Sequence, residues 1–488
     1  MAVILEHSSL QNKRTMNNWL LLLLCLLANT LLLAQKKIPV TKLLQDYDYL
    51  RTLLEEEHQG LSYYTTPQKT KQYLDSLRAT IKDPLTQEAF YRKILAATVI
   101  TNEGHTGVSL PKKWRKKYKK NKLFLPLDIQ FAGEEAVIVG YYGEISNSIE
   151  RGDKLLSING KSIHEIMETF QQYLVTDGFN VTSLYEWSSW SFALYYYLLY
   201  EKNDHFEIKI ERFKDQKYQK INLTAIAATE IKASNNQLPN IKLEEIFNVV
   251  QLDRGIAYLQ VPSFSTHKNF ERFYKEAFAQ FKAWNTKHLI IDIQHNGGGE
   301  EGNENLLASY LIRAPFQKYK AVLVKEAWYK EKKRSKDFVE DGWSIRNGQP
   351  CRGAFTLQSD YYSTLKYQKP DSTLLYEGQV YVLTGGETFS GGAEFASMLK
   401  MKDRAIFVGE ETGGVYEGNV SGYTNVVKLP CTRIAVHIPL VHFQINVEPS
   451  LRGHGVLPDY KVINTQATLA KGENAKLQFA LELIKGKI

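Results

Sequence analysis

Residues 289–299 read LIIDIQHNGGG, and this stretch decides the fold. A short apolar run that ends in a glycine turn is typical of a buried strand. Apolar runs at 256–261 and 379–383 alternate with a helical pattern at 269–284. Alternation of buried strands and helices predicts an α/β domain, a mixed sheet with flanking helices. We expect this core to span residues 240–465.

Three further units are predicted around the core. Apolar residues recur at helical spacing between residues 38 and 110, which indicates a helical N-terminal unit. Short alternating runs within 120–225 predict a β-rich domain. An aromatic-rich insertion at 165–200 interrupts this domain, and core packing is the default explanation for its rings. Residues 466–488 are expected to form a C-terminal helix.

The first 34 residues have the pattern of a secretory signal peptide. Lys13 and Arg14 precede an apolar run at 19–33, and Ala34 offers a small residue for cleavage. An uncleaved anchor and a lipid anchor on Cys25 are the alternatives. We therefore expect an exported protein, periplasmic or secreted, with association with the cell envelope as an option.

Charge and composition limit the kinds of binding partner and cofactor that we expect. The 488 residues carry a net charge of +8, and much of that excess lies in the basic stretch at 112–122. This stretch is either a solvated helix face or a peripheral contact with an anionic membrane surface. Export argues against a nucleic acid partner. Cys and His show no metal-ligand spacing, so no metal or cofactor is expected, and a disulfide between Cys351 and Cys431 stays open.

Ser390 is the candidate nucleophile. The run TGGETFSGG at 384–392 places it between a predicted strand and a predicted helix. A sharp turn there can present the hydroxyl, and the glycines that follow let a substrate backbone approach. The alternative is an ordinary N-cap, since serine commonly begins helices.

Four segments in order resemble one family. Residues 289–299, the segment 388–396, VGEETGG at 408–414 and GVLPD at 455–459 are similar to the motifs of the C-terminal processing (tail-specific) protease superfamily and the tricorn-core-like serine peptidases. The resemblance implies a ClpP/crotonase-like peptidase core. IERGDKLLSINGK at 149–161 resembles the signature of PDZ domains, which capture peptide ends, and an ordinary hairpin is the alternative.

The resemblance also implies a general base. The tail-specific branch takes a lysine after its VGExTxG run, but this chain has Val415 there. The tricorn-like branch takes a histidine from a G-H-T motif, which matches Gly104, His105 and Thr106. We therefore expect His105 to accept the proton of Ser390, because an imidazole titrates near neutral pH.

The remaining site residues follow from the same resemblance. Glycine amides of the triple-glycine turn and the amide after the nucleophile form the oxyanion hole, which implies Gly297, Gly298 and Gly391. The tricorn-like pattern also has a serine where this chain has Gly104 and a glutamate where it has Arg452. Glu448 is named as the acidic partner, with Glu410 and Glu411 as the other acidic residues considered.

These observations favour an exported serine-type peptidase. It would cleave peptide or protein substrates, engaged through the C-terminus in the tail-specific manner, by way of an acyl-enzyme on Ser390. A catalytically inactive protein that binds peptides or hydrophobic ligands on the same fold is the alternative, and a hydrolase of another ester or amide class is the third reading.

Overall fold

The computed structural model describes most of the chain after the predicted signal segment. It covers residues 37–121, 123–142, 149–200, 202–230, 247–265, 269–326, 343–346, 349–352, 368–448 and 451–487. The predicted signal peptide and the Cys25 alternative lie outside these ranges. Within them, no helix has the length and apolarity needed to cross a bilayer.

The N-terminal unit is a bundle of three helices followed by a short strand and a basic helix. The elements are α2 (Val40–Glu56), α3 (Pro67–Ala79), α4 (Gln87–Val99), β1 (Gly107–Ser109) and α5 (Lys112–Lys120). Leu43, Tyr47, Leu50 and Leu54 recur at helical spacing on α2 and are buried in the largest core cluster. In α5, Trp114 is buried against Tyr91 of α4, so the basic stretch is a helix with one apolar anchor.

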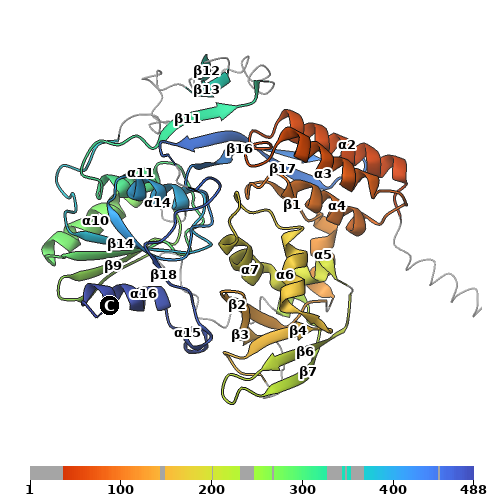
Figure 1. Ribbon diagram of the computed structural model, residues 1–488, viewed down its shortest axis with the longest axis horizontal. Coiled ribbons are helices and arrows are strands. Elements are labelled where there is room, and N and C mark those ends of the chain that lie inside the picture. Colours follow the sequence, from red (N-terminus) through yellow and green to blue (C-terminus); the bar gives the residue numbers. More distant parts are fainter. Residues whose placement is uncertain are drawn as a thin grey trace, which may run out of the picture.

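The β-rich domain is an antiparallel sheet with two helices. Its elements are β2 (Leu127–Ala132), β3 (Glu135–Tyr141), β4 (Lys154–Ile158), β5 (Lys161–Ser162), α6 (Ile163–Gln171), α7 (Thr182–Leu199), β6 (His205–Glu211) and β7 (Tyr218–Thr224). The strand order is β2-β3-β4-β6-β7, with β5 on β4. The aromatic insertion is α7, and Figure 1 shows it between this sheet and the core domain.

The core sheet has the order β18-β15-β14-β10-β9-β8. Its elements are β8 (Asn248–Asp253), β9 (Ile256–Gln260), α10 (Phe270–Ala283), β10 (His288–Asp292), α11 (Asn303–Ser309), β14 (Gln379–Thr384), α14 (Gly391–Met401), β15 (Ala405–Gly409) and β18 (Tyr460–Lys461). The strands from β9 to β18 are parallel, and β8 is antiparallel to β9. The predicted mixed α/β fold is confirmed. In a parallel sheet, functional loops gather at the carboxyl ends of the strands.

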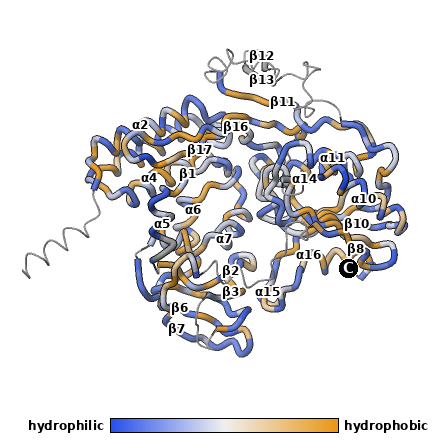
Figure 2. The backbone as a smooth tube through the Cα atoms, turned by 180° about the vertical axis from the view of Figure 1, so that it is seen from behind, coloured by the Kyte–Doolittle hydropathy of each residue, from blue (hydrophilic) through white to orange (hydrophobic). Residues whose placement is uncertain are grey.

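A second sheet joins the N-terminal unit to the core. It has the order β1-β17-β11-β13-β12, with β16 on β17. The elements are β11 (Tyr319–Val324), β12 (Trp343–Arg346), β13 (Gln349–Arg352), β16 (Gly418–Lys428) and β17 (Ala435–Ile445). Because β1 pairs with β17, the segment just before β1 is held against the core domain. Figure 2 shows apolar segments concentrated in the strands of both sheets.

The C-terminus differs from the single helix expected at 466–488. It forms α15 (Gln466–Lys471) and α16 (Ala475–Ile484). Gly472 ends α15 in a left-handed conformation, with φ 69°, which glycine adopts without steric cost. Asn474 then caps α16 by accepting a hydrogen bond from Leu477 N–H. The Gly-Glu-Asn sequence between the helices therefore encodes the break.

Candidate active site

Ser390 occupies the tight turn between β14 and α14, at the carboxyl end of the core sheet (Figure 1). Its backbone has φ 51° and ψ −127°, a conformation that strains any residue with a side chain. An N-cap serine ordinarily accepts a hydrogen bond from the first helical turn. The Ser390 side chain makes no such capping bond. Its hydroxyl is therefore presented by a strained turn and is not used to begin the helix.

The triple-glycine turn packs directly against Ser390. Asn296 joins the two turns, because its carbonyl accepts Phe389 N–H at 2.9 Å and its Oδ1 accepts Gly298 N–H at 2.8 Å. Gly298 has φ 94°, and a Cβ there would lie 2.8 Å from Ser390 Cβ and 2.7 Å from Gly391 N. Only glycine fits this position, because the space and the backbone angle both exclude a side chain.

The amides next to Ser390 differ in part from those expected. Gly391 is the first residue of α14, so its N–H has no acceptor within the helix and lies at the positive end of the helix dipole. Gly298 N–H is already donated to Asn296, which removes it as an oxyanion donor. Gly299 N lies 3.7 Å from the position of a Cβ on Gly391, whereas a Cβ on Gly297 would have no neighbour within 4 Å. The short distance adds Gly299 to Gly391 as a candidate donor, and the expected role of Gly297 stays a prediction.

His105 faces the nucleophile turn from the N-terminal unit. Its ring centroid lies 4.7 Å from that of Phe389, the residue before Ser390. Its Nδ1 lies 2.9 Å from Glu103 Oε1. With Nδ1–H donated to a carboxylate, Nε2 is the nitrogen left to accept a proton. Burial lowers the pKa of His105 below its usual value, which keeps the imidazole in its basic form at neutral pH.

The carboxyl group at His105 is Glu103, which is 2% exposed. Its Oε2 accepts Val420 N–H from β16 at 2.7 Å. Burial raises the pKa of Glu103 to about 7. The carboxyl is therefore fully charged only on the alkaline side of neutrality.

Asp177 completes a buried pair of carboxyl groups. Its Oδ1 accepts Gly104 N–H at 2.6 Å, and the side chain is 1% exposed. Burial, followed by the neighbouring Glu103, raises the pKa of Asp177 well above its usual range. Two adjacent buried carboxyl groups cannot both ionise, so they share one proton. Asp177 holds that proton and leaves the negative charge on Glu103, beside the imidazole.

The residue before His105 explains one departure from the family pattern. A Cβ on Gly104 would lie 2.7 Å from the Trp187 ring and 2.9 Å from the Phe389 ring. Trp187 comes from α7, and its ring centroid lies 5.2 Å from that of Phe389. The aromatic insertion thus occupies the room that a serine side chain at position 104 would need.

Glu448 does not lie at the site. Its side chain is 95% exposed and its carboxylate lies 3.7 Å from Lys320 Nζ. The sequence suggested Glu448 because it shortly precedes the GVLPD motif at 455–459. In the structure its carboxylate faces solvent and not the His105 ring. Glu410 instead pairs with Lys476 at 2.9 Å, and Glu411 contacts His454 Nδ1 at 3.0 Å.

Two other departures from the family have clear structural consequences. Val415 is 2% exposed and lies in an isolated bridge with Gly455, so the position of the tail-specific lysine is apolar and buried. Arg452 donates to Tyr63 O at 2.7 Å and lies over the Tyr63 ring. The arginine therefore braces the N-terminal unit where the family has a glutamate.

A buried charged network supports the helix that carries Ser390. Lys318 is fully buried, and its Nζ contacts Glu304 Oε1 at 2.5 Å and Glu394 Oε2 at 2.8 Å. Glu394, in the first turn of α14, also accepts hydrogen bonds from Tyr319 and Asn419. Both carboxylates keep the Lys318 pKa high, so this lysine is a permanent cation and cannot serve as the base.

Two clusters in the described ranges have the donor types for a metal ion. One is Glu103, His105 and Asp177, and the other is Glu186, His295 and Glu387, with donor atoms within 4.8 Å of one another. In the second cluster His295 Nδ1 lies 2.9 Å from Glu387 Oε2, and charge attraction to that carboxylate raises the His295 pKa. A proton on the imidazole accounts for this contact without a metal.

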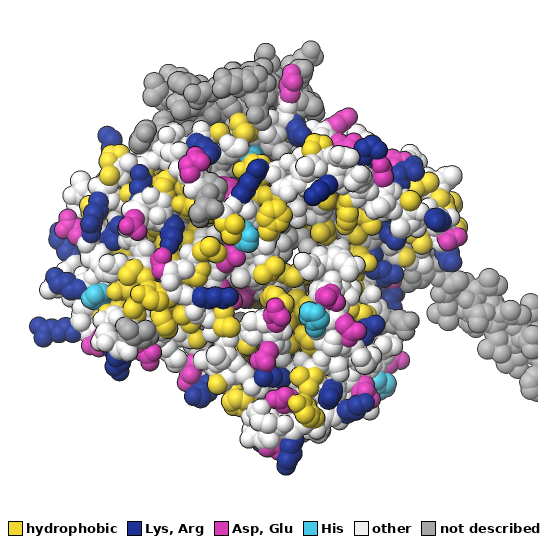
Figure 3. Space-filling model, viewed as in Figure 1, with side chains coloured by type: hydrophobic (Ala, Val, Ile, Leu, Met, Phe, Trp, Pro, Cys, Tyr) yellow, Lys and Arg dark blue, Asp and Glu magenta, His cyan; other side chains and the backbone are white. Residues whose placement is uncertain are grey.

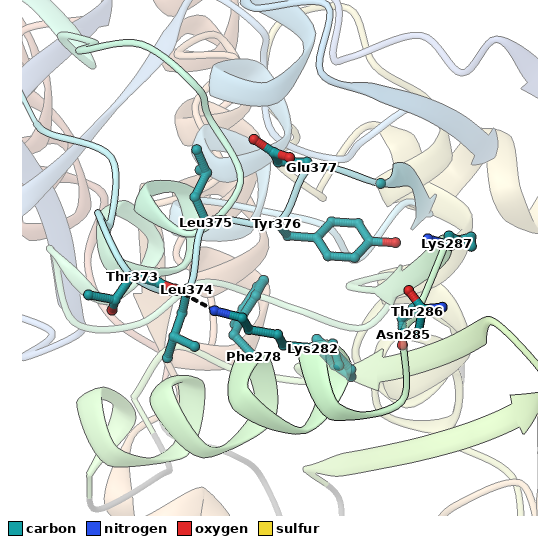
Figure 4. A pocket seen from close by; sticks show the side chains of 12 residues that line it. Phe278, Lys282, Asn285, Thr286, Lys287, Thr373, Leu374, Leu375, Tyr376 and Glu377 are labelled. Carbon is teal, nitrogen blue, oxygen red and sulfur yellow. Dashed lines mark hydrogen bonds between the residues drawn. The ribbon is translucent and has the colours of Figure 1, made fainter.

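The hollow drawn in Figure 4 is not the active site. It has a volume of about 550 Å³ and lies between α10 and the segment 373–378. Lys282 of α10 reaches across it to the Thr373 carbonyl at 3.4 Å. None of the candidate site residues line it.

Glu103 and Asp177 are the two site residues that sequence reasoning missed. Glu103 stands two positions before His105, inside a stretch that reads as a polar turn. That proximity was the available signal, although a carboxylate beside a loop histidine is usually solvated. Asp177 is 72 residues beyond His105, and only the fold brings the two together.

Comparisons with known proteins bear on the fold that carries this site. The model of peptidase family S41 matches residues 255–462. Mature CPAF is 16% identical over 91% of this chain and 96% of that chain, with a TM-score of 0.64. A CPAF mutant is 15% identical over the same shares, with a TM-score of 0.66.

Mature CPAF complexed with lactacystin is 16% identical over 91% of this chain and 97% of that chain, with a TM-score of 0.63. Identity this low shows a shared fold. Residues 255–462 therefore match the model of peptidase family S41, and this match together with the shared fold supports a serine-type peptidase.

Proposed function

We propose that the protein is an exported serine endopeptidase that cleaves peptide or protein substrates through an acyl-enzyme on Ser390. One observation carries the proposal. His105 lies against Phe389, next to Ser390, and donates Nδ1–H to a buried glutamate. This arrangement supplies the tautomer and the orientation that a histidine base needs.

The chemistry follows from these positions. His105 Nε2 accepts the Ser390 proton while Oγ attacks the substrate carbonyl carbon, and the imidazolium is stabilised by Glu103. The negative charge on the carbonyl oxygen is stabilised by the Gly391 and Gly299 amides. The tetrahedral intermediate collapses as His105 returns the proton to the leaving amine, which leaves an acyl ester on Ser390. Water, deprotonated by His105, then hydrolyses that ester and restores the serine hydroxyl.

The partner and compartment belong to the same proposal. The apolar run at 19–33 after two basic residues supports export. On the face shown in Figure 3, cationic and anionic side chains are interspersed, with patches of apolar side chains between them. Such a surface suits a polypeptide better than a polyanion. The exposed lysines of α5 support a peripheral contact with an anionic membrane.

The test uses purified protein without the first 34 residues, with β-casein as substrate and a fluorophosphonate as active-site probe. Wild type is expected to cleave casein and to be labelled, and Ser390→Ala is expected to lose both. His105→Gln should fold as wild type and lose labelling at least a hundredfold. If Ser390→Ala cleaved casein as fast as wild type, the proposal would be contradicted. Well-folded wild type with neither labelling nor cleavage would favour the binding-protein alternative.

A further inference from the structure

The outer strand of the β-rich domain is where a peptide end could add to the molecule. Among the described strands β2 pairs with β3 alone, so its other edge is open to a further strand. Leu127 and Ile129 of β2 share one buried cluster with Phe170 of α6. Domains that capture peptide ends seat them between such a strand and such a helix, and backbone amides before the strand hold the carboxylate.

In this protein α7 already occupies that groove. It packs against both β2 and α6, and Figure 1 shows it beside α6 and over β2. Phe192 of α7 is 2% exposed, with its ring centroid 5.3 Å from that of Phe170 on α6 and 6.5 Å from that of Phe131 on β2. The ring centroid of Tyr185, two turns earlier on the same face of α7, lies 5.2 Å from that of Phe131. An incoming peptide side chain would have to displace these rings.

Two of the amides before β2 are also engaged in hydrogen bonds. Leu123 N–H and Phe124 N–H both donate to the Ile226 carbonyl, at 2.8 and 3.0 Å. Pro126 has no N–H to offer. Leu127 lies in the ladder with β3, opposite Tyr141. These bonds reduce the amides that the segment can offer to a terminal carboxylate, although Leu125 N–H is not among the bonded ones. The one charged residue within α7 is Glu186, an anion that would repel such a carboxylate.

The other side of α7 is fastened to the core domain. Asn180 donates to the Thr412 carbonyl, and Thr182 Oγ1 donates to the Glu411 carbonyl at 3.0 Å. A Cβ on Gly386 would lie 2.4 Å from the Thr182 carbonyl oxygen, so the two backbones meet closely. Release of α7 from the groove would therefore require these contacts to break as well.

We propose that α7 permanently fills the peptide groove of the β-rich domain, so that the enzyme selects internal segments of its substrates and not their C-terminal carboxylates. This inference rests on the proposed peptidase function and names its substrate class. It also differs from the expectation that a PDZ-like domain here captures peptide ends. The β-rich domain acts as a fixed support for α7, whose Trp187 packs beside the nucleophile turn.

A matched pair of peptides tests the inference. A peptide bond that wild type cleaves in β-casein is identified first. A twelve-residue peptide spanning that bond is then made with a free C-terminal carboxylate and with a carboxamide. The two forms are expected to have kcat/KM values within fivefold of each other. A preference of more than fivefold for the carboxylate form would overturn the inference.

A binding measurement with Ser390→Ala gives an independent readout. The same two peptides, labelled at the N-terminus with fluorescein, are titrated with this variant and followed by anisotropy. Equal Kd values for the two forms support the filled groove, and Kd values more than fivefold tighter for the carboxylate contradict it. Failure of the proposed function looks different, because wild type would then cleave neither peptide and Ser390 would resist the fluorophosphonate.

Discussion

Glu103→Gln tests whether the buried carboxylate at His105 drives the chemistry. Glutamine keeps an oxygen that can accept Nδ1–H from His105, and it is nearly the same size as glutamate. It removes the negative charge that faces the imidazolium formed during attack. We therefore expect kcat to fall while KM changes little, because the lost interaction exists mainly in the transition state.

The magnitude follows from the contact distance. His105 Nδ1 and Glu103 Oε1 are 2.9 Å apart, which places the two charge centres about 4 Å apart. At an effective dielectric constant of about 20, two unit charges at that separation attract by about 4 kcal/mol. Each 1.36 kcal/mol corresponds to about a tenfold change in rate, so the expected loss in kcat is about a thousandfold.

The pH dependence gives the same substitution a second signature. Since the pKa of Glu103 is raised to about 7, wild-type kcat should fall as the pH drops through 7 and the carboxylate is protonated. The kcat of the variant should not fall as the pH drops through 7. It should fall only at more acidic pH, where His105 is protonated, because the pKa of His105 is lowered. The assay is initial-rate cleavage of one peptide substrate between pH 5 and pH 9.

Stability should move in the opposite direction to activity. The folded protein binds the Glu103 proton more tightly than the unfolded chain does, because its pKa rises from 4.5 to about 7. That contribution is complete below pH 4.5 and is lost as the pH rises through 7, at a cost of about 3 kcal/mol. The Tm of Glu103→Gln relative to that of wild type should therefore rise from pH 4.5 to pH 8, on top of a pH-independent cost where the amide nitrogen replaces the oxygen that accepts Val420 N–H.

Asp177→Asn is the matched control. It removes one carboxyl of the same pair but keeps an oxygen for Gly104 N–H and supplies an amide donor in place of the carboxylic proton. Its kcat at pH 8 should stay within about tenfold of wild type, since Glu103 keeps its charge. A Glu103→Gln enzyme within tenfold of wild type at pH 8, with an unchanged acid limb, would refute the assignment of Glu103.

Three further substitutions probe the supports of the site. Gly298→Ala should lower the rate of fluorophosphonate labelling of Ser390 at least a hundredfold, because the new Cβ would lie 2.7 Å from Gly391 N and displace the turn that carries Ser390. Gly104→Ser, although it restores the family residue, should lower kcat/KM at least tenfold and shift the tryptophan fluorescence, since its Cβ would lie 2.7 Å from Trp187. Lys318→Met leaves two buried carboxylates without their cation and should destabilise the protein by about 3 to 5 kcal/mol in urea unfolding.

The core of the fold could be predicted because its signals are local. Strands β10, β14 and β15 are short apolar runs with glycines at or just after their ends, so each strand and its turn could be identified within about ten residues. Ser390 and the glycine turn belong to such a unit, and the structure packs them together. The break between α15 and α16 was missed, although Gly472 is the kind of residue that ends a helix.

The acidic partner could not be predicted because it depends on burial, which the sequence does not display. Glu448 and Glu103 are both glutamates near a motif, yet the side chain of Glu448 is 95% exposed and that of Glu103 is 3% exposed. The difference arises where β16 passes the histidine turn and gives Val420 N–H to Glu103. That contact joins residues 317 positions apart, so neither periodicity nor spacing indicates it.

The same long-range packing links the base to the β-rich domain. Asp177, which holds the proton of the carboxyl pair, begins the segment that leads into α7. Three residues later Asn180 is fastened to the core domain, and further along Phe192 fills the groove beside β2. Any movement of α7 out of that groove would therefore pull on Asp177 and, through Gly104, on the histidine turn. Displacement of α7 would disturb the histidine that serves Ser390. The substrate must therefore reach Ser390 without binding in that groove.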